Sequence, residues 1–427
     1  MKSVMDKKLR LYLHIPFCVR KCKYCDFVSF AGKEEQFEAY VDSLCNEIRV
    51  RGEVYKDREI SSIYIGGGTP SILPEDLMER IVNALNQSFH ISGTKEKRKG
   101  FHLQKKIRPV TEFSIECNPG TVDKKKLKAY KKMGINRISF GLQTSDPEGL
   151  KALGRIHSFD DFIESFESAR EAGFDNINVD LMQAIPEQTL SGWQRTLALL
   201  TTWKPEHISA YSLIVEEGTP FYEMQQKGQL ILPDEDEERE IYYYTKEFLE
   251  KCGYRRYEIS NYAIPGFECR HNIGYWKRDD YLGLGLNSSS MVDNLRWKNT
   301  EDLSDYMEVF SHPFSEAEFF RGDKPLPEQT GEGEQNVPVS KIIKDVHPLS
   351  HKEQMEESMF LGLRMTEGIS KQEFFDTFRQ DFDYTYGETV LKLKEKGLLK
   401  EEEGRVFLTD KGVDISNTVL AEFLLDQ

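Results

Sequence analysis

The sequence lacks any long hydrophobic run. No stretch of about 18 apolar residues occurs in its 427 residues, so the length needed to cross a bilayer as a helix is missing. The first ten residues are MKSVMDKKLR, and they hold no apolar segment of the kind that directs secretion. We therefore expect a cytoplasmic protein.

Two further absences narrow the functional class. Basic residues are in deficit, with 57 Lys and Arg against 72 Asp and Glu, which argues against a general nucleic-acid-binding protein. The seven cysteines are an odd number in a chain without an export signal. Disulfides are therefore not expected, and clustered cysteines indicate metal ligands. Because hydrophobic residues make up 39% of the chain, an ordered core is expected.

The first two thirds of the chain alternates between strand-like and helix-like segments, since the apolar period switches between about 2 and about 3.6 residues. Six such units predict right-handed βαβ crossovers and a parallel sheet, that is, an α/β fold of the partial (β/α)6 barrel type. Chemistry in such folds lies at the C-terminal ends of the strands. The expected strands are 11–15, 61–68, 111–119, 136–143, 175–182 and 207–213, and the expected helices are 34–52, 73–85, 122–134, 158–173 and 190–201.

Composition predicts three parts. Residues 1–290 form the barrel with an extension, and residues 291–348 form a connecting segment whose end is rich in Gly, Pro, Glu and Gln. Residues 350–427 form a small helical domain, with helices near 352–364, 370–379 and 385–397 before a hairpin at 398–409. This order resembles a winged helix. Because this part is acidic, packing or partner docking is a better interpretation than DNA binding.

Residues 94–108, TKEKRKGFHLQKKIR, interrupt the pattern with seven basic residues and one acid. They are either a solvated insertion or a contact with an anionic partner or a membrane surface.

Three closely spaced cysteines are the strongest signal. Cys18, Cys22 and Cys25 have the spacing C-x3-C-x2-C directly after the first expected strand. Iron–sulfur clusters are held by thiolates, normally four, so three thiolates leave one iron open to chelate an amino and a carboxylate group. Two alternatives stay open: three unrelated core cysteines, or a zinc site with His14 as the fourth ligand.

This spacing, with Tyr24 before the last cysteine, resembles the signature of the radical S-adenosylmethionine (SAM) superfamily. The resemblance implies a [4Fe–4S] cluster that reduces SAM to methionine and a 5′-deoxyadenosyl radical. One unit later comes a glycine turn, Gly66-Gly67-Gly68-Thr69-Pro70. Such a turn lets the backbone approach a ligand and offers N–H groups to it. It matches the superfamily element that holds the methionine amino group.

Polar residues recur at or just after the ends of the next expected strands, namely Glu116, Gln143, Arg155 and Asp180. Each alone could be structural, but one in each consecutive unit favours a ligand site, because buried polar groups need partners.

A closer resemblance rests on HIPFC, CDF, GGGTPS, ECNPG, the GLQ–R pair, NVDLM with IPEQT, and YEISNYA. These segments resemble the family of oxygen-independent coproporphyrinogen III oxidases and their relatives, the HemW-type haem chaperones, over roughly residues 10–290 and more loosely beyond. By that resemblance, the residues that contact SAM are Tyr12, Gly67, Gly68, Thr69, Glu116, Gln143, Arg155 and Asp180.

Three features favour the chaperone branch over the oxidase. Cys25 is followed by Asp26 and Phe27 rather than by a fourth cysteine, and only ten residues precede the first expected strand. The segment 271–276 reads HNIGYW and matches the HNxxYW motif associated with haem in that branch.

The HNxxYW motif has a chemical interpretation. The imidazole of His271 suits haem iron, and Tyr275 and Trp276 offer flat surface to a porphyrin. The alternative is a packing histidine beside core aromatics. Cys269 is a weaker candidate ligand, better interpreted as a buried thiol.

The turn 283–288, GLGLNS, departs from the usual pattern of the family. In the oxidase this region helps form a second SAM pocket, so the change weighs against that pocket.

The resemblance therefore implies a haem chaperone, not an active oxidase, that passes haem to acceptor proteins, notably respiratory ones, and that can form a homodimer. The alternative is the oxidase, which converts coproporphyrinogen III to protoporphyrinogen IX by oxidative decarboxylation. A third reading is an interaction protein with a degenerate site, which the intact cysteines and glycine turn disfavour.

Overall fold

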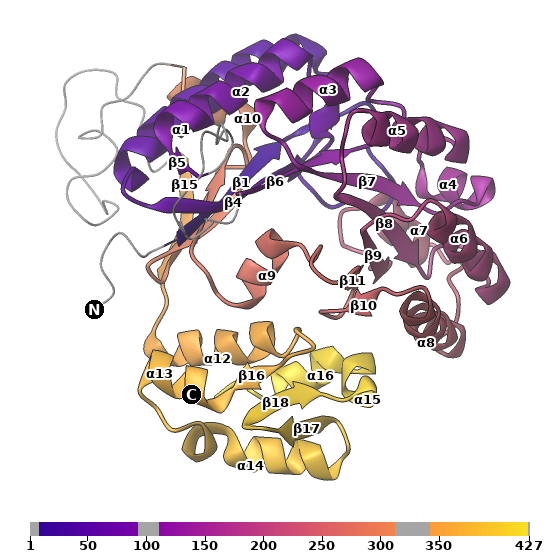
Figure 1. Cartoon of the computed structure of the whole chain (residues 1–427), viewed down its shortest axis with the longest axis vertical. Helices are drawn as coiled ribbons and strands as arrows, with labels where there is room; N and C mark the ends of the chain where they lie inside the picture. The colour runs from indigo at the N-terminus through magenta and orange to yellow at the C-terminus, as the bar shows by residue number, and fades with distance from the viewer. Residues whose placement is uncertain (1–7, 93–110, 312–341, 426–427) are drawn as a thin grey trace, which may run out of the picture. The chain divides into compact units, whose positions relative to one another are not determined.

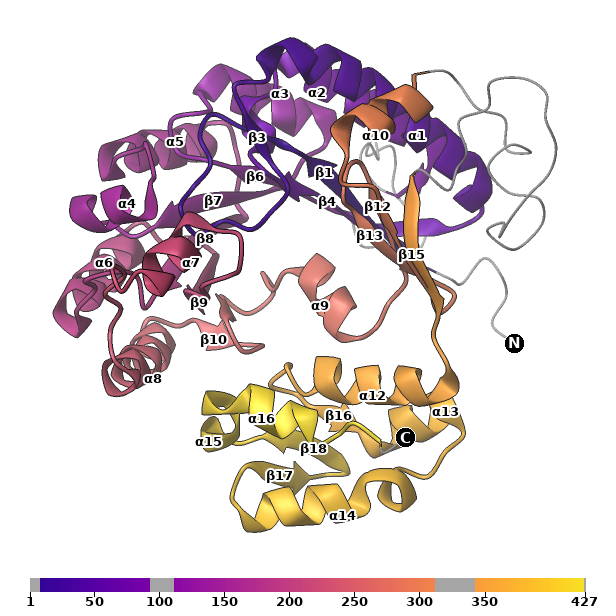
Figure 2. The same cartoon turned by 180° about the vertical axis from the view of Figure 1, so that it is seen from behind.

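The computed structural model describes residues 8–92, 111–311 and 342–425 (Figure 1 and Figure 2). The basic segment 94–108 lies outside these residues. Two compact units share the chain. The first comprises Met1–Phe140, Asp160–Asp175 and Asp280–His347, and the second comprises Gly141–Phe159, Asn176–Asp279 and Pro348–Gln427. Within the described residues, no helix combines the length and apolar character needed to span a membrane.

The first unit is built on a sheet whose central strands run parallel. Its strands, in spatial order, are β7 (Arg137–Gln143, of which Arg137–Phe140 belong to this unit), β6 (Glu112–Cys117), β4 (Glu59–Gly67), β1 (Lys8–Ile15), β12 (Tyr281–Leu284), β13 (Ser289–Val292), β14 (Leu295–Asn299) and β15 (Ile343–Pro348), with β5 (His90–Ile91) beside β4. Strand β12 pairs with β1 in parallel and begins a run of antiparallel strands.

Helices of the first unit follow the parallel strands in the chain, as expected for βαβ crossovers. They are α1 (Phe37–Tyr55), α2 (Glu75–Ser88), α3 (Lys124–Met133) and α5 (Phe159–Glu171), with short turns η2 (Glu34–Gln36) and η3 (Pro70–Ile72). Helix α10 (Leu303–Val309) instead follows the antiparallel strand β14. Helices α1, α2 and α3 lie side by side along one face of the sheet (Figure 1). Helix α3 is capped at both ends: the Asp123 carboxylate accepts the Lys126 N–H, and Gly134 ends the helix at φ 102°.

The second unit contains the remaining parallel pair, β8 (Ile177–Gln183) and β9 (His207–Ser212). Strand β11 (Asn261–Ala263) pairs antiparallel with β9, and β10 (Arg255–Arg256) pairs with β11. The helices here are α4 (Pro147–Leu153), α6 (Leu190–Thr202), α7 (Pro220–Gln226), α8 (Glu235–Lys251) and α9 (Arg270–Trp276).

The last part of the second unit has the expected winged-helix order. Helices α12 (His351–Gly362), α13 (Lys371–Phe378) and α14 (Phe382–Glu395) precede the hairpin of β17 (Leu399–Glu402) and β18 (Arg405–Leu408). Strand β16 (Ile369–Ser370) completes the small sheet, and α15 (Asp410–Asp414) and α16 (Ser416–Ala421) follow. Aromatic and aliphatic side chains from all three helices and the hairpin form one buried cluster.

The predicted elements match the observed ones to within a few residues, and one placement is wrong: Asp180 lies within β8, not at its end. The predicted helices omit both α8, which has 17 residues, and α9, which with seven residues has too few positions to show a period. The expected boundaries at residues 290 and 348 stay a prediction.

A buried polar network in the first unit is centred on Glu47. The Glu47 carboxylate of α1 is fully buried and accepts hydrogen bonds from Gly285 N–H at 2.7 Å, Tyr306 Oη at 2.7 Å and Asn299 Nδ2 at 2.8 Å. The fully buried Arg51 guanidinium lies 3.7 Å from the same carboxylate. Burial raises the pKa of Glu47, whereas these donors and the Arg51 cation favour its ionised form.

The same network fixes the turn 283–288. Tyr40 donates to the His14 carbonyl at 2.7 Å and accepts the Leu286 N–H at 3.1 Å. A Cβ at Gly285, where φ is 93°, would lie 2.6 Å from the His14 carbonyl oxygen. Glycine is therefore required for the turn to pack against β1.

We predict that Glu47→Leu lowers the free energy of unfolding by about 3–5 kcal/mol, because Arg51 would lose its buried counter-charge. Urea unfolding measures the change. The exposed Glu38 on the same helix is the control, and Glu38→Gln should cost less than about 0.5 kcal/mol. Equal costs for the two variants would contradict the role given to the network.

Candidate functional site

The three cysteines lie on one loop that is closed at its base. After β1, β2 (Phe17–Cys18) pairs with β3 (Phe30–Ala31), and the Phe30 N–H donates to the Pro16 carbonyl at 2.8 Å. Cys18, Cys22 and Cys25 are partly exposed thiols on this loop, and the Cys25 N–H donates to the Cys22 carbonyl at 3.4 Å. Burial raises the pKa of the Cys25 thiol to about 11. The protein without metal therefore carries this side chain as a thiol.

His14 is not oriented as a fourth metal ligand. Its Nδ1 lies 3.1 Å from the Tyr12 hydroxyl and its Nε2 lies 2.8 Å from the Val28 carbonyl, so both ring nitrogens have partners. Burial lowers the pKa of His14. Among residues 8–92, 111–311 and 342–425, no three His, Cys, Asp or Glu side chains converge to hold one metal ion. The two hydrogen bonds of the His14 ring therefore weigh against the zinc interpretation, in which His14 is the fourth ligand.

The glycine turn after β4 is joined to the cysteine loop by backbone hydrogen bonds. Gly68 N–H donates to the Ile15 carbonyl at 2.9 Å, and Thr69 N–H donates to the Phe17 carbonyl at 2.7 Å. The Thr69 hydroxyl lies 3.5 Å from the Cys18 sulfur. The cysteine loop and the glycine turn are 41 or more residues apart in the sequence. Their contacts nevertheless form one structure around Cys18.

Each glycine of the turn has neighbours that a side chain would strike. A Cβ at Gly68 would lie 2.6 Å from the Phe17 carbonyl oxygen and 3.0 Å from the Cys18 sulfur. A Cβ at Gly66 would lie 3.0 Å from the Glu116 carboxylate, and Gly67 has φ 110°. This backbone cradle beside three thiols fits a cluster with an amino-acid ligand on its open iron.

Glu116 holds the turn from the neighbouring strand β6. Its carboxylate accepts Gly67 N–H at 3.1 Å and the Tyr64 hydroxyl at 3.0 Å. Sequence reasoning missed Asn118, whose amide donates to the Thr69 hydroxyl at 2.9 Å. Its position in the ECNPG segment, just beyond a strand end, was the available signal.

The other three SAM-site candidates belong to the second unit. Gln143 ends β7 with φ 70°, an uncommon conformation for this residue type, and its side-chain oxygen accepts from the Tyr211 hydroxyl at 3.1 Å. Arg155 donates to the Gly141 carbonyl at 2.6 Å. Asp180 accepts from the Asn178 amide at 2.8 Å. All three are thus held by local partners.

The HNxxYW motif folds as helix α9. His271 is buried, and its Nε2 lies 3.1 Å from the Tyr275 hydroxyl, with the two rings edge to face. Spacing by four residues places both on one side of the helix. Trp276 packs instead against Tyr257, Ala263 and Met365. The structure therefore brings His271 and Tyr275 together and directs Trp276 into an apolar cluster.

The segment at the end of α9 contacts both α12 and the residues that follow it. The Arg364 guanidinium lies 4.5 Å from the Trp276 ring centroid, at a distance typical of cation–π contacts. Arg278 and Glu357 form a buried ion pair at 2.9 Å. These contacts couple α9 to the C-terminal helices within the second unit.

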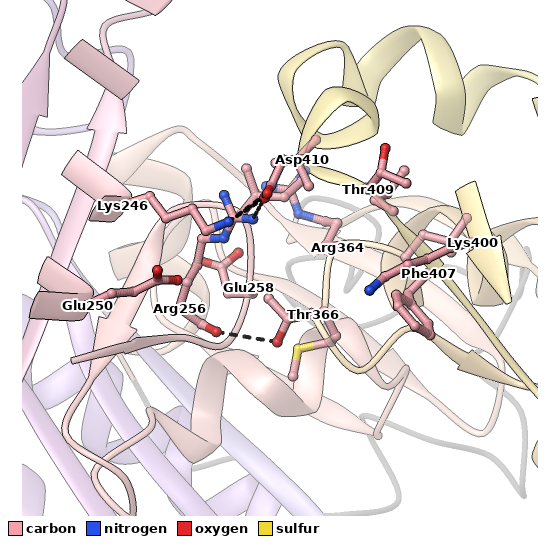
Figure 3. A pocket seen from close by; sticks show the side chains of 15 residues that line it. Lys246, Glu250, Arg256, Glu258, Arg364, Thr366, Lys400, Phe407, Thr409 and Asp410 are labelled. Carbon is pink, nitrogen blue, oxygen red and sulfur yellow. Dashed lines mark hydrogen bonds and ion pairs between the residues drawn. The ribbon is translucent and has the colours of Figure 1, made fainter. Parts of the chain in front are cut away.

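The second unit also contains a cavity of about 290 Å³ beside these contacts (Figure 3). Asp410 is bonded there by Lys246 at 2.7 Å and by Arg256 at 3.0 Å. The hydrogen bond from Lys246 lowers the pKa of Asp410. Lys246, Arg256 and Asp410 thus engage one another at the cavity wall, which is typical of a packing contact.

We predict that Gly68→Ala lowers the iron content of reconstituted protein and weakens SAM binding about tenfold, because its Cβ would displace the Cys18 loop. Iron analysis and calorimetry measure the two effects. Gly387→Ala is the control, since a Cβ there meets only the Asp383 Cβ at 3.6 Å. Normal iron content in the Gly68 variant would contradict the claim that the glycine turn positions the cysteine loop.

Comparison with known proteins finds two family models that match separate parts of the chain. Residues 12–200 match the model of the radical SAM superfamily, and residues 349–415 match the HemN C-terminal domain. A Lactococcus lactis protein named heme chaperone HemW is 34% identical over 423 residues, which cover 99% of each chain. A Bacillus subtilis protein of the same name is 34% identical over 413 residues, which cover 97% of this chain and 98% of the relative.

A solved structure confirms the predicted fold class. The coproporphyrinogen III oxidase HemN from Escherichia coli, a radical SAM enzyme, matches with a TM-score of 0.78 at 20% identity, covering 98% of this chain and 91% of that chain. At this identity the likeness concerns the fold alone. The two full-length relatives carry the assignment further: the chain belongs to the HemW family of the radical SAM superfamily.

Proposed function

We propose that this protein is a haem chaperone that binds haem at α9 and passes it to acceptor proteins. The observation that carries the proposal is the His271–Tyr275 pair, in which a buried imidazole lies 3.1 Å from a phenol hydroxyl on one short helix. The name carried by the full-length relatives supports the same function.

The cluster loop and glycine turn have a defined part in this proposal. Cys18, Cys22 and Cys25 would hold a [4Fe–4S] cluster, which when bound supplies an electron to SAM. Glu116 keeps the Gly67 N–H in place, and Asn118 orients the Thr69 hydroxyl beside Cys18. These groups orient the ligand without large movement, because their own hydrogen bonds already fix them.

Haem binding at His271 would replace an existing contact. A neutral imidazole nitrogen is a normal axial ligand of haem iron, and the Nε2 of His271 now faces the Tyr275 hydroxyl. Exchange of this hydroxyl for iron requires α9 to move, since His271 is only 1% exposed. The N-cap residue Cys269 makes no side-chain capping bond, so α9 depends on contacts with the rest of the unit for its position.

We predict that reconstituted wild-type protein binds haem saturably and that His271→Ala weakens the affinity at least about tenfold. Anaerobic titration followed by Soret absorbance measures the binding. His351→Ala is the control, because this ring instead contacts the Phe378 carbonyl in the C-terminal helices. It should bind haem like the wild type.

Two outcomes would count against the chaperone. One is the absence of specific haem binding by the wild type. The other is the formation of protoporphyrinogen when the reconstituted protein receives coproporphyrinogen III and SAM without oxygen, which would favour the oxidase.

The proposal extends to the setting of the protein. We place it in the cytoplasm, with respiratory haem proteins as acceptors and a homodimer as one state.

We also propose that the basic residues 94–108, outside the described structure, contact anionic membrane surfaces. A variant with glutamine at the lysines of this segment should lose sedimentation with anionic vesicles, and unchanged sedimentation would remove the idea.

A further inference from the structure

A buried hydrogen-bond chain runs through the second unit from Asp180 to the start of α9. Asn178 Nδ2 donates to Asp180 Oδ1 at 2.8 Å, and Asn178 Oδ1 lies 2.6 Å from His207 Nδ1. His207 Nε2 lies 2.8 Å from the Tyr257 hydroxyl. That hydroxyl also accepts the backbone N–H of Cys269 at 3.3 Å. Five residues from four segments of the chain therefore form one continuous connection.

The chemistry of the groups sets the direction of each bond. The Asn178 carbonyl oxygen only accepts, so His207 Nδ1 carries a proton. In the neutral ring Nε2 is then an acceptor, and the Tyr257 hydroxyl donates to it. The Tyr257 oxygen is left to accept from Cys269. No member can rotate without breaking the bond of its neighbour.

Burial makes these bonds costly to break. The exposed fractions are 2% for Asn178, 0% for His207, 8% for Tyr257 and 0% for Cys269. A buried donor or acceptor that loses its partner has no water to replace it. Only the Asp180 end, which is partly exposed, is accessible to a ligand.

Tyr257 connects this chain to α9 in a second way. Its ring packs with Ile273 and Trp276 of α9 in one apolar cluster. Because α9 has no side-chain N-cap, the Tyr257 hydroxyl on the Cys269 N–H takes part in setting where the helix starts. A shift of Tyr257 would therefore move both the start of α9 and its apolar face.

We infer that Asn178, His207 and Tyr257 couple SAM bound at Asp180 to haem bound at α9. This inference rests on the proposed function for haem at α9 and on the contact between SAM and Asp180 that the family resemblance predicts. A ligand that hydrogen bonds to the Asp180 carboxylate changes its orientation toward Asn178, and the buried chain carries that change to the Cys269 N–H. By linkage, each ligand changes the affinity of the other by the same factor.

The first experiment needs no haem. Hydrogen exchange of a peptide that spans residues 269–277 is followed in cluster-reconstituted protein, with and without saturating SAM. We expect SAM to slow exchange in the wild type and to have no effect in Tyr257→Phe, which lacks the bridging hydroxyl. No effect of SAM on the wild type would overturn the inference.

Ser209→Ala is the matched control. The Ser209 hydroxyl donates to the same Asn178 oxygen at 3.2 Å but lies on a side branch. This variant also loses one buried hydroxyl, and we expect it to keep the SAM effect. Loss of the effect in both variants would show general loosening instead of a specific route. If Tyr257→Phe does not fold, His207→Gln breaks the chain at the next member.

The second experiment measures the haem dissociation constant with and without SAM. We expect a change of about fivefold or more in the wild type and none in Tyr257→Phe. Haem affinity that does not depend on SAM would overturn the coupling while leaving the chaperone function intact. Absence of haem binding would instead remove the proposed function, and the exchange experiment would still decide whether α9 senses Asp180.

Discussion

The close approach of the glycine turn to the cysteine loop is the constraint on which the candidate site depends. Gly68 lies so near the Phe17 carbonyl and the Cys18 sulfur that no side chain fits between them. Two backbone hydrogen bonds keep this distance. Glu116 and Asn118 then fix the turn from β6. The position of Cys18 is thus determined by three strands at once, and the loop does not need its own secondary structure.

Strand β1, which leads into the cysteine loop, is supported by Tyr40 and the Glu47 network. Tyr40 holds the His14 carbonyl, and Glu47 holds the Gly285 N–H in the turn after β12. The unusual GLGLNS sequence therefore has a structural role against β1, whatever its effect on ligand pockets. Glu47 and Arg51 are fully buried, and all the contacts described for Glu47 join it to groups of the first unit.

Sequence predicted the cluster residues because their spacing is local. Cys18, Cys22 and Cys25 fall within eight residues, and strand periodicity placed Glu116 and Gln143 at an edge of a parallel sheet. It could not predict that Trp276 turns away toward Met365, because that contact joins α9 to residues almost ninety positions later. The contacts among Asn178, His207 and Tyr257 could not be predicted for the same reason: although Asn178 and Tyr257 lie in the segments NVDLM and YEISNYA, only the fold brings them to His207.

The two buried networks differ in one physical respect that decides what each can do. The Glu47 network joins fully buried groups, so no ligand reaches Glu47 itself and its effect is on stability. The chain from Asn178 to Cys269 ends at the partly exposed Asp180 on one side and at α9, whose N-cap residue makes no side-chain capping bond, on the other. In the inferred coupling, a ligand acts at the first end and α9 responds at the second. Coupling between sites requires an element that both sites bias, and in the inferred coupling that element is α9.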